Sequence, residues 1–186
     1  MTQTPVKLSF EEYLTYDDST ENRYELVDAE LVLMPPATGK HEAIITLLLI
    51  RFYLEIQRLR LDWQVRPSGT GVRTAKGKSR LTDLCVMTAQ QKQEIDNSSA
   101  ILQSPPLLVV EVVSPESVKR DYEQKPTEYA ASQIPEYWIV DPLLNKVSVL
   151  LLVDGHYETT AFTEQQRIIS QTFPELALTA EQVLSA

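Results

Sequence analysis

The 186-residue sequence contains a single cysteine and no long hydrophobic run. One cysteine, Cys85, cannot form an intramolecular disulfide or a cysteine-rich zinc site, and it is typical of a reducing compartment. The most apolar segment, residues 44–50, is far too short to span a bilayer. The first residues also lack the apolar core that a secretory signal requires. We therefore expect a soluble, cytoplasmic protein that does not bind membranes.

An excess of basic residues is absent as well. The chain has 17 Lys and Arg against 26 Asp and Glu, so its formal net charge is −9. This balance argues against a protein that coats nucleic acid non-specifically. Basic residues are nevertheless concentrated between Arg66 and Arg80, where five occur without an acid, and again in residues 119–125. Such runs either form solvated loops or make local contacts with phosphates.

The length suits a single domain covering residues 1–186. Hydrophobic periodicity and turn signals predict an α/β protein with a mixed central β-sheet flanked by helices and an N-terminal β-hairpin. In the first half of the chain, we expect a capped helix at 9–16, the hairpin at 23–36, a long amphipathic helix at 40–60, a strand and turn at 63–74 and a basic loop at 76–80. In the second half, we expect a polar linker at 90–99, a helix from Pro126 to 133, strands over 136–162 and a last helix capped by Thr179.

Glu111 is the most informative residue, because it lies within an aliphatic run bounded by prolines. Residues 107–113 are short and rich in β-branched side chains, which predicts a strand buried on both faces. An unpaired charge there would cost on the order of several kcal/mol. Glu111 is therefore expected to have a cation, a metal ion or strong hydrogen-bond donors beside it.

A second buried strand also contributes one acid. Asp83 lies in the segment RLTDLCVM, 28 positions before Glu111. Two carboxylates on neighbouring strands suit Mg²⁺, which binds one or two carboxylates and leaves its other positions for water and phosphate. Such a site suits phosphodiester hydrolysis. Ordinary ion pairs of these acids with Arg80 or Lys119 remain the alternative.

The sequence resembles the Uma-two family, classed among the endonucleases of the PD-(D/E)XK superfamily. The resemblance is carried by the hairpin RYELVDAELVLM, by His41 at the start of the long helix, and by the segments LTDLCVM, LLVVEVVSPES, DYEQKPTEYAASQIPEYWIVDP and DGHYE. It extends over nearly the whole chain. The resemblance implies a restriction-endonuclease-like fold and a metal-dependent nuclease.

Carried over by position, the resemblance implies that Asp83 and Glu111 are catalytic metal ligands. The superfamily proline before the aspartate is Thr82 here. The superfamily lysine two residues after the glutamate is replaced by Val113, which cannot perform its role. In the family pattern a lysine of the following helix replaces it, which implies a catalytic role for Lys125.

Further residues have two interpretations each. Lys119 is either the catalytic lysine in place of Lys125 or a solvated loop lysine. Glu25 resembles an additional catalytic acid or forms a surface ion pair, and His41 is an acid, base or water-orienting group or an exposed histidine. Asp121 matches the acid that precedes the family lysine, or it simply begins the helix or pairs with Lys125. Packing rather than ligand stacking is expected for Tyr129, Tyr137 and Trp138, burial for Cys85, and a structural role for His156.

We therefore expect a metal-dependent endonuclease that uses Mg²⁺ or Mn²⁺, acts on nucleic acid, DNA in the first place, and works as a homodimer. Val113 and the negative net charge leave open a catalytically inactive nuclease-fold protein that binds nucleic acid or a protein partner. A metal hydrolase acting on a small phosphoester is a third possibility, since no broad basic face is predicted.

Overall fold

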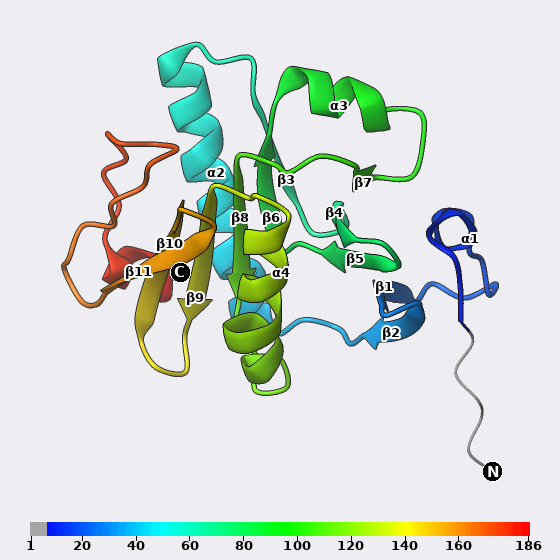
Figure 1. Ribbon diagram of the computed structural model, residues 1–186. Helices are drawn as coiled ribbons and strands as arrows, with labels where there is room; N and C mark the ends of the chain where they lie inside the picture. Colours follow the sequence, from blue (N-terminus) through cyan, green and yellow to red (C-terminus); the bar gives the residue numbers. More distant parts are fainter. Residues whose placement is uncertain (1–6) are drawn as a thin grey trace.

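The computed structural model describes residues 7–186 and combines β-sheets with flanking helices (Figure 1). No helix of these residues is both long and apolar enough to cross a membrane. The elements in chain order are α1 (Phe10–Leu14), β1 (Arg23–Val27), β2 (Glu30–Met34), α2 (Gly39–Leu59), β3 (Gln64–Pro67), β4 (Gly71–Ala75), β5 (Lys78–Leu81), β6 (Leu84–Met87), α3 (Ala89–Ile95), β7 (Ile101–Leu102), β8 (Leu108–Val112), the π-helical turn η1 (Arg120–Gln124), α4 (Lys125–Ala131), β9 (Glu136–Asp141), β10 (Lys146–Val153), β11 (His156–Phe162) and α5 (Ala180–Leu184).

The strands of the described residues form two sheets rather than the one predicted. The first has the order β2-β1-β5-β4-β7 and the second the order β11-β10-β9-β8-β6-β3. Both sheets are mixed, because β4 pairs with β7 in parallel and β8 pairs with β9 in parallel. The predicted α/β class with flanking helices is confirmed.

Strand β8 occupies the middle of the second sheet and is covered on both faces. Leu108, Val110 and Val112 join the core cluster that includes α2, whereas Val109 and Val113 join the cluster that includes Tyr129 of α4. Figure 1 shows the sheet lying between these two helices. Because side chains alternate along a strand, Glu111 points to the same side as Val109 and Val113, toward α4.

The N-terminal hairpin and the helix caps follow the sequence signals. Strands β1 and β2 pair in antiparallel register around Asp28 and Ala29, both with positive φ. Ser9 and Thr179 form the predicted capping boxes of α1 and α5. The long helix α2 also lies where its periodicity predicted, with Thr38 as the N-cap.

Three segments differ from the prediction. The expected polar linker contains α3, which begins with a capping box of Thr88 and Gln91 and buries Ile95. The expected basic loop is a short turn that leads into β5. The helix expected from Pro126 begins earlier, because the turn η1 runs directly into α4 and Pro126 occupies its first turn.

Candidate active site

The candidate site is a cavity of about 510 Å³ beside the connection between the two sheets. Asp83 lies between β5 of one sheet and β6 of the other, and Glu111 comes from β8. His41 is contributed by the first turn of α2 and Lys125 by the start of α4. These four residues line the same cavity, and Glu25 of β1 lies next to Lys125. The fold thus brings together all five residues that the sequence singled out.

Asp83 is held by the backbone of β8 and by His41. Its Oδ2 accepts a hydrogen bond of 2.7 Å from the Val112 N–H and lies 3.0 Å from His41 Nε2. Only 13% of the His41 side chain is exposed, so the alternative interpretation of His41 as an exposed histidine is wrong. Asp83 pairs with His41 rather than with Arg80, the partner that the ion-pair alternative named.

The pKa values of this pair shift in opposite directions. Burial acts to raise the pKa of Asp83, but the hydrogen bond and positive charge of His41 outweigh burial and hold that pKa below its ordinary value. Burial also acts to lower the pKa of His41, and the Asp83 carboxylate raises it above its ordinary value. The pair therefore favours a negative Asp83 beside a protonated His41.

Glu111 is held through both carboxylate oxygens by α4. Lys125 Nζ lies 2.7 Å from Oε2, and the Tyr129 hydroxyl donates a hydrogen bond of 2.6 Å to Oε1. Lys125 and Tyr129 are four residues apart, so they lie on one face of the helix. The partner of Glu111 is thus Lys125 and not Lys119, which is exposed.

Burial dominates the electrostatics of Glu111. Desolvation raises the pKa of Glu111 well above its ordinary value, although the charge of Lys125 opposes this, and the negative charges of Asp83 and Asp121 raise it further. Burial acts to lower the pKa of Lys125, but Glu111, Asp121 and Glu25 outweigh it and keep the ammonium charged. The carboxylates around Glu111 therefore favour additional positive charge.

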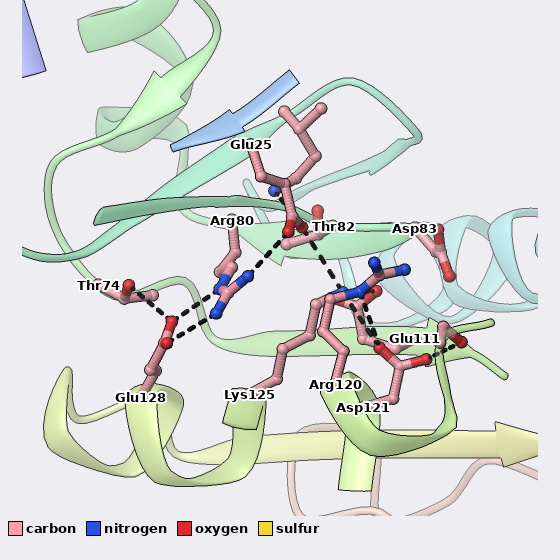
Figure 2. Close-up of polar contacts among 12 residues, drawn as sticks. Glu25, Thr74, Arg80, Thr82, Asp83, Glu111, Arg120, Asp121, Lys125 and Glu128 are labelled. Atoms are coloured by element: carbon pink, nitrogen blue, oxygen red, sulfur yellow. Dashed lines mark hydrogen bonds and ion pairs between the residues drawn. The ribbon is translucent and has the colours of Figure 1, made fainter. Parts of the chain in front are cut away.

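Glu25 belongs to a buried ion-pair network rather than to a surface pair. None of its surface is exposed, and its Oε2 accepts a hydrogen bond of 2.9 Å from Arg80 Nη1. Arg80, only 2% exposed, also donates to both oxygens of Glu128 at 2.7 Å. Figure 2 shows this chain of carboxylates and cations from Glu128 through Arg80 to Glu25 and on to Lys125.

The same network corrects the interpretation of the basic run at residues 66–80. Arg80 is buried and cannot contact nucleic acid. Lys78 pairs with Asp28 and Glu128, and Arg66 lies 3.4 Å from Asp96. Most of the positive charge of this run is therefore matched by acids of the protein itself.

Asp121 lies at the edge of the cavity, in η1. Its Oδ1 lies 3.3 Å from Lys125 Nζ, and its Oδ2 accepts a hydrogen bond from the Ser117 hydroxyl. The Oδ1 atom is buried and has no hydrogen-bond partner among the described residues. Asp121 is thus an acid of the site and does more than begin a helix.

The remaining predicted residues have packing or surface positions. Val113, Tyr137, Trp138 and Cys85 are buried, as predicted for the two aromatic residues and the cysteine, and burial raises the pKa of Cys85 to about 12. His156 is exposed at the start of β11, where its Nδ1 lies 3.1 Å from the Asp154 carbonyl oxygen.

Comparison with known proteins identifies the family of the chain. The sequence model of Uma2, described as "putative restriction endonuclease", matches residues 10–181. The chain belongs to the Uma2 family. No curated protein matches the chain.

A solved structure supports the fold of this Uma2 member. The crystal structure of a protein from Anabaena variabilis, described as a "putative nuclease belonging to DUF820", superposes with a TM-score of 0.79 at 19% sequence identity. The match covers 96% of this chain and 98% of the other. The predicted restriction-endonuclease-like fold is consistent with this likeness, and the family assignment made from the sequence is confirmed.

The carboxylates of this Uma2 site suit a hard divalent cation. No group of three or more His, Cys, Asp or Glu side chains within residues 7–186 is arranged to hold a metal ion. Two carboxylates nevertheless line the cavity at Asp83 and Glu111, and Asp121 adds a buried oxygen without a hydrogen bond. Mg²⁺ is bound by one or two carboxylates with water and phosphate completing its shell, so this donor set fits it.

Sequence reasoning missed the contacts of three residues in or beside the site. Tyr129 was assigned to packing alone, although its position four residues after Lys125 places both on one helix face. Arg80 was considered only as a partner of Asp83 or Glu111, and its pair with Glu128 was missed because the two meet only in the folded protein, 48 positions apart. No local pattern in the sequence indicates that pair.

Proposed function

We propose that the protein is a metal-dependent endonuclease that hydrolyses phosphodiester bonds of nucleic acid, with DNA as the first substrate to examine. One observation carries the proposal: Asp83, Glu111 and Lys125 line one cavity in a member of a family described as restriction endonucleases. Carboxylates bind hard cations, and a lysine ammonium offsets the negative charge of a phosphate.

In this proposal Asp83 and Glu111 hold Mg²⁺ or Mn²⁺, and the other residues position them. When bound, the ion supplies a more acidic water and neutralises phosphate charge. The backbone N–H of Val112 and His41 Nε2 fix the orientation of Asp83. Tyr129 fixes Glu111 by donating to Oε1.

Lys125 supplies the positive charge that the superfamily places in the slot of Val113. Its ammonium lies on the cavity wall, 2.7 Å from Glu111 and 3.3 Å from Asp121. There it can stabilise the negative charge that develops on a phosphate during hydrolysis. Glu25, 3.8 Å from Nζ, contributes by keeping Lys125 charged and in place.

The test is cleavage of supercoiled plasmid, single-stranded DNA and RNA in the presence of Mg²⁺ or Mn²⁺. We expect Asp83→Asn and Glu111→Gln to lower the cleavage rate about a hundredfold or more, since each removes a charged ligand of nearly the same shape. Asp96→Asn is the matched control, because Asp96 pairs with Lys92 away from the cavity. Equal cleavage by the wild type and both site variants would show that Asp83 and Glu111 are not catalytic residues.

The second candidate function is binding of nucleic acid without cleavage. Val113 favours it, because a buried valine stands where the superfamily lysine would be. Lys125 favours it too, since its ammonium already contacts three carboxylates. Binding of DNA or RNA without cleavage under any of the metal conditions would select this candidate.

We further propose that the protein forms a homodimer through α2. Ile50, Tyr53 and Leu54 follow a helical spacing and are each more than half exposed, at 51%, 53% and 54%. Exposed apolar stripes of this kind mark association surfaces. Sedimentation at micromolar concentration should give a dimer that Leu54→Glu converts to a monomer, whereas Gln93→Glu, on the exposed side of α3, should leave it intact. A monomeric wild type would contradict the proposal.

A further inference from the structure

Arg120 differs from Lys125 and Arg80, the two buried cations of the site. Lys125 contacts Glu111 at 2.7 Å, and Arg80 is fully engaged by Glu25 and Glu128. Arg120 lines the cavity, yet none of residues 7–186 accepts a hydrogen bond from its guanidinium. Its closest carboxylate contact, from Nε to Asp121 Oδ1, measures 3.8 Å, which is too long for a hydrogen bond.

The position of Arg120 directs these unused donors into the site. The side chain is 21% exposed, and its Nε atom is buried without a hydrogen-bond partner. Figure 2 shows its guanidinium extending from η1 toward the side of the cavity that carries Asp83. Because Nε is buried, the terminal nitrogens are the donors left for a ligand in the cavity.

The chemistry of the guanidinium specifies the ligand. Its planar set of donors matches two oxygens of one phosphate, which a lysine ammonium cannot do. A free carboxylate ligand is a poor alternative, because Asp83, Glu111 and Asp121 already make the cavity acidic. A phosphodiester bound with a cation brings both the anionic oxygens for Arg120 and compensation for those acids.

We propose that Arg120 binds a phosphodiester group of the nucleic acid substrate through its terminal nitrogens. This inference rests on the proposed function for the identity of the ligand. It adds a substrate-binding residue that the motif positions do not include. Arg120 lies five residues before Lys125, and η1 is the turn that lets both side chains line one cavity.

The test measures binding rather than cleavage. Fluorescence anisotropy with labelled DNA and RNA oligonucleotides, in Ca²⁺ instead of Mg²⁺ and with intact label verified on a gel, should give an affinity about tenfold lower for Arg120→Gln. Arg120→Lys should recover only part of the loss, because the charge returns without the planar donors. Lys119→Gln, which removes the same charge from the exposed neighbouring residue, should bind as the wild type does.

The salt dependence of binding separates a phosphate contact from a structural role. Loss of one contact should reduce the slope of log affinity against log salt by about one for Arg120→Gln and leave it unchanged for Lys119→Gln. Equal affinities of the wild type and Arg120→Gln, or a wild type that binds neither oligonucleotide, would overturn the inference. Binding that depends on Arg120 without cleavage in any metal would instead contradict the proposed nuclease function and leave this inference standing.

Discussion

Lys125 Nζ lies 2.7 Å from Oε2 of Glu111, and both side chains are only 2% exposed. A buried ion pair of this kind is costly to break, because removing one partner leaves a charge in a poorly solvated place. It also joins β8 to α4, so the same contact supports the fold and shapes the candidate site. Variants of this pair can therefore show how much the contact contributes to the stability of the fold.

We expect Lys125→Met to lower the free energy of unfolding by about 3 kcal/mol, since Glu111, Asp121 and Glu25 lose their shared cation. In the double variant with Glu111→Gln the loss should be smaller than the sum of the two single losses, because the uncompensated carboxylate is gone. Urea denaturation of the four proteins measures this cycle. Additive losses would show that the two side chains do not interact.

Tyr129 gives a prediction that separates positioning from stability. Tyr129→Phe removes the donor to Glu111 Oε1 and should cost about 1–2 kcal/mol of stability. If the proposed function holds, it should also slow cleavage, because Glu111 is no longer held through both oxygens. Tyr157→Phe is the control: it removes a hydroxyl that donates to the Ile134 carbonyl oxygen, away from the cavity. A similar loss of activity in both variants would argue against positioning.

The Glu128 carboxylate gives a pH-dependent prediction. Burial acts to raise the pKa of Glu128, but hydrogen bonds and charge from Arg80 and Lys78 outweigh it and lower that pKa. The stabilisation is therefore fully present above the ordinary value of 4.5 and is lost as the pH falls through the lowered folded value. The stability difference between wild type and Glu128→Gln should be about 3 kcal/mol at neutral pH and shrink in acid.

Urea denaturation across the acid range, with exposed Glu123→Gln as the control, measures this dependence. Glu123→Gln should differ from the wild type by less than about 0.5 kcal/mol throughout. A difference for Glu128→Gln that grows in acid would contradict the assigned direction.

Metal binding can be followed without any substrate. At a Mn²⁺ concentration about a hundred times the dissociation constant, binding to the folded state adds about 2.7 kcal/mol and should raise the melting temperature by roughly 5–10 °C. The rise should disappear in Asp83→Asn and remain in Asp96→Asn. Each variant is compared with its own metal-free sample, which removes the effect of losing the His41 contact. An equal rise in both variants would place the ion elsewhere.

Much of the fold was predictable because local signals carry it. The hairpin around Asp28, the periodicity of α2 and the aliphatic strand around Glu111 each follow from neighbouring residues. Helix α3 was missed because the Gln, Asn and Ser of residues 90–99 were interpreted as a polar linker, despite the capping box of Thr88 and Gln91. There the local signal was present and was given too little weight.

The burial of the cations in the site could not be predicted from the neighbouring residues in the sequence. Arg80 reads as part of a solvated basic run, and its burial depends on Glu25 and Glu128, which lie 55 and 48 positions away. The type of partner that Glu111 requires, by contrast, could be predicted from the sequence. A carboxylate in an aliphatic strand requires a donor or a cation, although only the fold identifies Lys125 and Tyr129 together.

The turn η1 carries a consequence for how this site tolerates changes in chain length. In η1 the Lys125 N–H bonds to the Arg120 carbonyl oxygen, one residue further back than in an α-helix. Since residues three and four apart lie on one face of an α-helix, deleting the exposed Gln124 would make this turn α-helical and would keep Arg120 and Asp121 on the face that carries Lys125. A single inserted residue would instead rotate Arg120 by about 100° relative to Lys125, which would separate the proposed phosphate contact from the ion pair of Glu111.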